Sequence, residues 1–206
     1  MMRLLVLGDS HIPKRAKEVP DPILEEIDNL TKDSLFDHIL FTGDLIESPT
    51  FIDFLNSKTE EEVLRVLGNM DYYGGNRNAP KMEYLEIPFA TGEELRIGLT
   101  HGAQIKDRGN HSQLEQLALE RDSHILVSGH THKEEIYLTK EAVLLLNPGS
   151  VTGAWSFLAT ETPAFIQVLI YKENPIEVIL YQLQDNRIQQ SRETFKFEKG
   201  RIRTIN

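Results

Sequence analysis

The stretch Ile125-Leu126-Val127-Ser128-Gly129-His130-Thr131-His132 (residues 125–132) joins an apolar run to two closely spaced histidines. Its aliphatic residues are typical of a short buried strand, and Gly129 permits a tight turn directly after it. Residues two apart in an extended segment point to the same side, so His130 and His132 are expected to reach one point. Neutral imidazole is the commonest metal ligand in proteins. The stretch indicates a strand ending at a metal site, against the alternative that the loop carries histidines without a role.

Four other stretches repeat this pattern, in which a short apolar run is followed at once by glycine beside Asp, Asn or His. They are Leu4–Leu7 with Gly8-Asp9-Ser10-His11, Ile39–Phe41 with Thr42-Gly43-Asp44, Val63–Leu67 with Gly68-Asn69-Met70-Asp71, and Ile97–Thr100 with His101-Gly102. The segments between them share no obvious similarity, so these are not sequence repeats. The recurrence favours a shared site over isolated polar loops.

Helical spacing of apolar residues predicts helices over Pro20–Thr31, Pro49–Leu55 and His111–Arg121. Strands that alternate with helices predict βαβ units and a largely parallel sheet. Ligands of such sheets bind beyond the carboxyl ends of the strands. We therefore expect all five polar clusters to lie along one edge of one sheet.

The last third of the chain changes to short strand-like runs with no convincing helix between them. The predicted strands are Ile136–Leu138, Val143–Leu146, Phe165–Tyr171, Ile176–Leu183 and Thr194–Phe197, and the turn at 90–93 predicts a hairpin of 83–88 with 95–99. No linker rich in Gly, Ser or Pro divides the chain. The sequence predicts one α/β domain over residues 1–206 with a two-sheet core.

Composition narrows the function. The 206 residues carry a formal net charge of −10, which argues against general nucleic-acid binding. It leaves a phosphate substrate open, because a bound cation supplies positive charge locally. No cysteine is present, so any metal must be held by nitrogen and oxygen. No apolar run is as long as a membrane span, and we expect a cytoplasmic protein.

The five clusters together supply seven candidate metal ligands: Asp9, His11, Asp44, Asn69, His101, His130 and His132. Seven N/O groups exceed one tetrahedral site and suit two divalent ions that share a carboxylate. Such a centre clamps the attacking and leaving oxygens of a phosphoryl displacement and provides a bridging hydroxide as nucleophile. Mixed imidazole and carboxylate ligands suit Mn²⁺, Zn²⁺, Fe²⁺, Co²⁺ or Ni²⁺. We predict a metal-dependent phosphoesterase acting on a phosphate ester, more favourably a phosphodiester than a monoester.

The ordered motifs G-D-S-H, G-D, G-N-x-D, H-G and G-H-T-H resemble those of the calcineurin-like metallophosphoesterases. The resemblance implies a four-layer α/β/β/α sandwich. It assigns Asp9, His11 and His132 to one metal and Asn69, His101 and His130 to the other, with Asp44 bridging. We expect catalysis to depend most directly on Asp44, Asn69 and His101.

A closer likeness lies outside the ligand motifs. Asn147–Trp155 (N-P-G-S-V-T-G-A-W) and the following P-A-F-I-Q-V-L-I are similar to the phosphoesterase-fold small subunit of the retromer sorting complex. That resemblance implies the alternative function, a protein-binding scaffold in sorting with a vestigial metal site and a retromer-type partner. Turn chemistry alone also explains Asn147–Ser150. Trp155, Phe157 and Leu158 are interpreted as core rather than as a docking patch.

Met70 departs from the wider superfamily, where a histidine at this position protonates the leaving group. Methionine has no proton to give, and general acid catalysis contributes about 10²–10⁴-fold. Asp71 is a poor replacement acid. His111 is interpreted as the start of a helix rather than as a residue that approaches the substrate.

Overall fold

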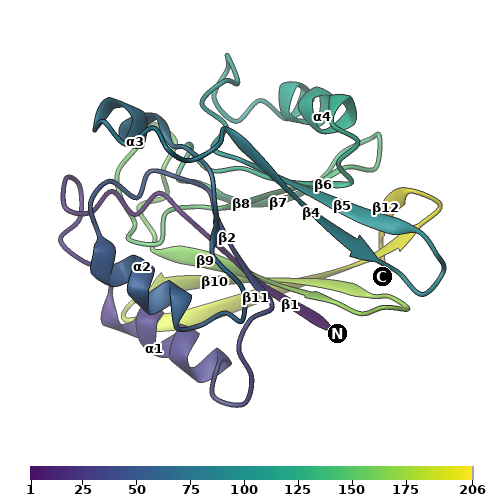
Figure 1. Ribbon diagram of the computed structural model, residues 1–206, viewed down its shortest axis with the longest axis horizontal. Helices are drawn as coiled ribbons and strands as arrows, with labels where there is room; N and C mark the ends of the chain where they lie inside the picture. The colour runs from purple at the N-terminus through teal and green to yellow at the C-terminus, as the bar shows by residue number, and fades with distance from the viewer. Residues whose placement is uncertain (206) are drawn as a thin grey trace.

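Two β-sheets pack face to face, with helices on their outer faces, in the computed structural model, which describes residues 1–205 (Figure 1). The helices are α1 (Asp21–Leu30), α2 (Pro49–Asn56), the short α3 (Asn69–Tyr73) and α4 (His111–Glu120). Prolines at the first turns of α1 and α2 favour helix starts there, because the missing N–H is not needed at that position. Asn110 begins α4 by accepting a hydrogen bond from the backbone N–H of Gln113 at 3.1 Å.

The larger sheet has seven strands in the order β12-β11-β10-β9-β1-β2-β3. Their bounds are β1 (Met2–Leu7), β2 (His38–Phe41), β3 (Leu64–Arg65), β9 (Ala164–Ile170), β10 (Ile176–Gln184), β11 (Arg187–Glu198) and β12 (Arg201–Thr204). Only the β1–β2 and β2–β3 pairs are parallel among the described strands of this sheet.

The smaller sheet has five strands in the order β4-β5-β6-β8-β7. Their bounds are β4 (Met82–Pro88), β5 (Glu94–Thr100), β6 (Ile125–Val127), β7 (Glu134–Leu138) and β8 (Leu144–Pro148). β4 and β5 form the predicted hairpin, and β5, β6 and β8 run parallel.

Three apolar clusters separate the layers. The central cluster lies between the sheets and includes Val6 of β1 and Leu99 of β5. A second packs α1 and α2 onto the large sheet, through residues such as Ile27 and Leu55, and a third packs Leu114 and Ala118 of α4 onto the small sheet. The layer order is therefore helix, sheet, sheet, helix, as the resemblance implied.

The predicted single edge of one sheet is wrong. Five apolar runs precede the polar clusters, but three belong to the large sheet (β1, β2, β3) and two to the small one (β5, β6). These five strands are divided between two sheets, and their carboxyl ends meet at one side of the sandwich. The expectation of a largely parallel sheet is likewise wrong, because both sheets contain antiparallel pairs. α3 and β12 were not predicted.

Within residues 1–205, no helix has the length and apolar character needed to cross a membrane.

Candidate metal centre

The seven predicted ligands come from loops at the carboxyl ends of five strands. Asp9 and His11 follow β1, Asp44 follows β2, and Asn69 opens α3 after β3. His101 follows β5, and His130 and His132 follow β6. Parallel central strands in both sheets point these loops the same way, so residues more than 120 positions apart become neighbours.

One group consists of His11, His132 and Asp9. The Nε2 atoms of His11 and His132 are 3.0 Å apart, and Asp9 Oδ1 lies 3.4 Å from His132 Nε2. All three side chains are buried. Three ligand atoms of these residues lie close enough to one another to surround a single ion.

A second group consists of His101, Asn69 and His130. The Nε2 atom of His101 lies 2.9 Å from Asn69 Oδ1 and 3.2 Å from His130 Nδ1. Asn69 and His130 are half-buried, whereas His101 is buried. This second group therefore lies nearer to solvent than the first.

Asp44 lies between the two groups. Its Oδ2 is 3.4 Å from Nε2 of His11 and 3.5 Å from Nε2 of His101. Its Oδ1 accepts a hydrogen bond of 2.7 Å from the backbone N–H of Met70. One carboxylate oxygen is thus fixed by the backbone, and the other faces both groups.

Backbone carbonyls orient two of the imidazoles. Nδ1 of His101 lies 2.8 Å from the oxygen of Thr42, and Nδ1 of His132 lies 2.7 Å from the oxygen of Ala154. A carbonyl oxygen only accepts, so each Nδ1 carries the proton and donates it. The lone pair of each neutral ring is then on Nε2, which faces the ligand groups, as metal-binding histidines require.

The residues present fit divalent cations. Asp9 Oδ1 is buried and has no hydrogen-bond partner among the described residues. An unpaired buried carboxylate oxygen is costly, and a cation is the partner that removes the cost. The donor set contains nitrogen and oxygen only, which matches first-row divalent metals.

In the metal-free cluster, the pKa values of the two carboxyl groups are shifted in opposite directions. Burial opposes ionisation of Asp9, but the adjacent His132 and His11 outweigh it and hold the pKa of Asp9 well below its usual range. Burial, together with the negative charge of Asp9, raises the pKa of Asp44. Burial, together with the neighbouring His101 and Arg108, lowers the pKa of His130 to about 3, which keeps this ring neutral and able to ligate.

The backbone at five of the seven residues adopts the left-handed region. The φ angles are 50° at Asp9, 51° at His11, 55° at Asp44, 70° at His130 and 59° at His132. Such angles cost about 1–3 kcal/mol each in a non-glycine residue and cluster at functional sites, although Asp and His tolerate them better than most. The strain is kept where the side chains converge.

Two glycines leave room for the carboxylates. A Cβ on Gly68 would overlap Oδ1 of Asp44, and a Cβ on Gly129 would lie 2.5 Å from Oδ2 of Asp9. Neither position has space for a side chain. The Gly-Asn and Gly-His pairs of the sequence therefore reflect close backbone approach to the two acidic residues.

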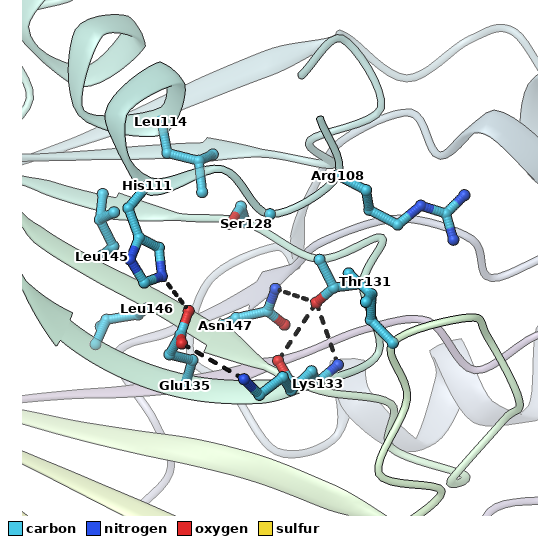
Figure 2. A pocket seen from close by; sticks show the side chains of 12 residues that line it. Arg108, His111, Leu114, Ser128, Thr131, Lys133, Glu135, Leu145, Leu146 and Asn147 are labelled. Carbon is cyan, nitrogen blue, oxygen red and sulfur yellow. Dashed lines mark hydrogen bonds and ion pairs between the residues drawn. The ribbon is translucent and has the colours of Figure 1, made fainter. Parts of the chain in front are cut away.

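The segment Asn147–Ala154 supports the ligand loops, a role that the turn interpretation missed. Asn147 Nδ2 donates to the oxygen of Gly129 at 3.1 Å. It also donates to Thr131 Oγ1 at 2.9 Å (Figure 2). Ser150 Oγ donates to the oxygen of Asp9 at 2.7 Å and accepts from the N–H of Ala154 at 2.9 Å. The sequence signal was a dense run of Asn, Gly, Ser and Thr, which turn chemistry also explains.

The two other candidate proton donors for the leaving group, Asp71 and His111, are engaged in other contacts. The carboxylate of Asp71 accepts three backbone N–H groups, those of Asp44, Ile46 and Gly68, at 2.8, 2.8 and 3.1 Å. Asp71 is therefore a clamp for the Asp44 loop. Met70 is half-buried beside it.

His111 begins α4, as interpreted, and belongs to a separate cavity of about 270 Å³. Its Nε2 lies 2.8 Å from Glu135 Oε2 (Figure 2). Its ring also stacks on that of Tyr137. Among the described residues that line this cavity, none is one of the seven predicted ligands.

The core interpretation of Trp155, Phe157 and Leu158 is wrong. Their exposed fractions are 53%, 84% and 45%. The apolar composition of the segment did not reveal this, because the chain there makes turns rather than a strand that faces the core.

Comparison with known proteins places this chain in a family. The calcineurin-like phosphoesterase superfamily domain matches residues 2–169. A probable metallophosphoesterase of Methanothermobacter thermautotrophicus is 36% identical over 151 residues, which are 73% of this chain and 78% of that protein. A crystal structure of a Vps29 variant from Entamoeba histolytica has a TM-score of 0.81 at 30% identity and covers 95% of this chain and 100% of its own.

A second structure from the same organism, of wild-type Vps29 complexed with Zn²⁺, has a TM-score of 0.77 at 28% identity, covering 94% of this chain and 99% of that one. The family match extends over most of the chain and includes all seven predicted ligands. The chain belongs to the calcineurin-like phosphoesterase superfamily, with Vps29 among its structural neighbours.

Proposed function

We propose that this protein is a metal-dependent phosphodiesterase that holds two divalent ions. Asp9, His11 and His132 would hold one ion, and Asn69, His101 and His130 the other. Asp44 would be shared between them. The observation that carries the proposal is the position of Asp44 Oδ2, which faces both groups at 3.4 and 3.5 Å.

The charges of the ligand set suit an anionic substrate. Only Asp9 and Asp44 carry full negative charge, while the other five ligands are neutral imidazole or amide groups. Two divalent cations bound here would supply net positive charge and lower the pKa of coordinated water, which provides a nucleophile near neutral pH. The buried imidazoles, fixed through Thr42 and Ala154, keep their ring nitrogens aimed at the site. Mn²⁺, Zn²⁺, Fe²⁺, Co²⁺ and Ni²⁺ all suit this donor set.

Space beside the cluster supports a diester. A diester carries an organic group on each side of phosphorus, and the second group must have somewhere to lie. A cavity of about 690 Å³ opens beside Asn69 and His101. That volume holds a sizeable substituent next to the reacting phosphate.

The test compares bis(p-nitrophenyl) phosphate with p-nitrophenyl phosphate, after chelation and after addition of Mn²⁺ or Zn²⁺. The expected result is metal-dependent release of p-nitrophenolate, faster from the diester. Asp44→Asn, purified in parallel, controls for a contaminating phosphatase. Equal activity in the variant, or faster cleavage of the monoester, would contradict the proposal.

A second candidate function is protein binding of the retromer type. It is favoured by the likeness to Vps29 and by the exposed rings of Trp155 and Phe157, whose centroids lie 5.1 Å apart. Large exposed apolar groups often mark interaction surfaces. A fully metal-loaded protein that cleaves neither aryl ester would favour this function over the enzyme.

A further inference from the structure

The groove beside Asn69 and His101 has an aromatic wall. It continues from these two residues along Tyr72, Tyr73 and Tyr84. Tyr72 is 43% exposed and Tyr73 is 77% exposed, although the ring of a tyrosine is largely apolar. Two adjacent exposed rings next to a predicted reaction centre call for an occupant with its own flat apolar surface.

The same groove has a positive charge balance. Lys81 and Arg121 line it, and both are exposed. Among the described residues that form the lining, none carries a carboxylate. The whole chain has 32 acidic and 22 basic residues, so this local balance is opposite to that of the protein. An anion is therefore attracted to this groove more than to the surface at large.

The rings are arranged for stacking rather than for packing inside the protein. Tyr72 and Tyr73 meet edge to face, with centroids 5.9 Å apart. The guanidinium of Arg77 lies 4.5 Å from the centroid of Tyr72 and occupies one face of that ring. Tyr73 has the larger exposed surface of the two. Any nucleobase can stack on such a ring, because every base has a π face.

We infer that this groove binds the nucleoside part of a nucleotide-type phosphodiester, with its base on Tyr73 and its anionic backbone beside Lys81 and Arg121. The inference rests on the proposed function, because it places the scissile phosphate at the metal ligands Asn69 and His101. It adds a substrate class and the residues that select it.

Calorimetric titration of the Mn²⁺-loaded protein tests the inference without requiring turnover. The probes are AMP and ribose 5-phosphate, which share the sugar phosphate and differ in the base. AMP is expected to bind about tenfold more tightly, since base–aromatic stacking is worth roughly that ratio or more. Tyr73→Ala should remove most of this advantage and leave ribose 5-phosphate unchanged. Tyr73→Phe, which keeps the ring, should retain it.

Phe157→Ala is the matched control, because Phe157 is 84% exposed and is not among the lining residues of the groove. It should leave both affinities as they are. Lys81→Gln combined with Arg121→Gln should weaken AMP and ribose 5-phosphate alike, because charge does not distinguish the base. Equal affinities for the two probes in the parent protein, or an unchanged AMP preference in Tyr73→Ala, would overturn the inference.

The outcome separates the groove from the activity. Hydrolysis of aryl diesters without any preference for AMP would overturn the groove inference and leave the proposed function standing. A Tyr73-dependent AMP preference without hydrolysis of any ester would support the groove and contradict the enzyme.

Discussion

The hydroxyl of Ser150 donates a hydrogen bond of 2.7 Å to the backbone oxygen of Asp9, 141 residues earlier in the chain. The same hydroxyl accepts from Ala154, whose carbonyl orients His132. One side chain therefore connects the backbone supports of two predicted ligands of the same ion. Ser150 is a positioning residue, because it acts through Asp9 and Ala154 rather than on a substrate.

Ser150→Ala is expected to lower the affinity for Mn²⁺ or Zn²⁺ about 10–100-fold, as is typical when an outer hydrogen-bond partner of a metal ligand is removed. Calorimetric metal titration measures the effect directly. Ser57→Ala is the matched control, because that hydroxyl donates to Phe54 at the exposed end of α2. An unchanged metal affinity in Ser150→Ala would show that the Asp9 loop needs no such support.

Asp44→Asn is expected to abolish metal-dependent hydrolysis without unfolding the protein. In the metal-free state Asp44 is a buried carboxylate near Asp9, and its pKa is raised by burial and by that neighbour. Removing its charge relieves repulsion, so the unfolding temperature of the metal-free variant should equal or exceed that of the parent. The stabilisation by added Mn²⁺ should shrink.

His101→Ala should lose most of the rate for a different reason, since it removes a ligand of one ion only. Thermal unfolding with and without metal separates the two effects, and a parent-like rate in either variant would place the activity elsewhere.

Two ions per chain are expected at saturation, because the ligand atoms form two groups joined at Asp44. Elemental analysis after gel filtration gives the ratio, and chelation followed by urea unfolding gives the linked stability. Ligand bound at 100-fold above its Kd stabilises by about 2.7 kcal/mol per site. His130→Ala should reduce the ratio toward one. A parent ratio of at most one under saturating metal would refute the dinuclear centre.

His124, which lies away from the metal centre, is expected to stabilise the fold by an amount that is lost at acidic pH. Burial lowers its pKa, against the raising effect of Asp122 and Glu93. Its Nδ1 accepts from the backbone N–H of Arg96 at 3.0 Å, which requires the neutral ring. Because the folded pKa lies below the unfolded value of about 6.5, the unfolded chain binds more protons below that pH. The stabilisation is thus present above pH 6.5 and is lost as the pH falls.

His124→Asn keeps an acceptor for Arg96 and removes the titration. Its packing loss against Phe197 should lower stability by a constant amount at every pH. The free energy of unfolding in urea, measured between pH 7.5 and 5.5 with chelator present, should therefore fall less steeply in the variant than in the parent. Parallel curves would mean that His124 takes no part in the acid dependence.

The local elements were predictable, whereas the division into sheets was not. The apolar spacing over Pro20–Thr31 and Pro49–Leu55 predicted α1 and α2 because each helix buries one face on a sheet. The same runs do not say which strands become neighbours. Leu5 pairs with Ile39 in one sheet and Ile97 with Ile125 in the other, and this choice depends on tertiary packing.

The candidate ligands could be named from the sequence because metal chemistry restricts residue types, and the structure brings their side chains together; that they bind metal stays a prediction. The supporting contacts were not readable, since hydrogen bonds from Asn147 and Ser150 span long separations in the chain. α3 was missed because five residues are too few to show a repeating helical pattern of apolar residues. β12 was missed because Arg201–Thr204 has only four residues and one apolar side chain, that of Ile202.

Met70 should make the rate depend steeply on the leaving group. Its backbone N–H holds Asp44, but its side chain has no proton to donate. Asp71 is committed to three backbone donors, and His111 is paired with Glu135 in another cavity. Without a proton from Met70, Asp71 or His111, negative charge builds up on the departing oxygen, and poor leaving groups are slowed most. A series of aryl and alkyl phosphodiesters with graded leaving-group acidity, run with saturating Mn²⁺, measures the slope.

Met70→His offers an imidazole at this position and should recover part of the roughly 10²–10⁴-fold that general acid catalysis supplies. The recovery should be largest for alkyl esters, and Met70→Leu should behave as the parent. A shallow slope in the parent protein would mean that an acid is already present, and the role assigned to Met70 would fail.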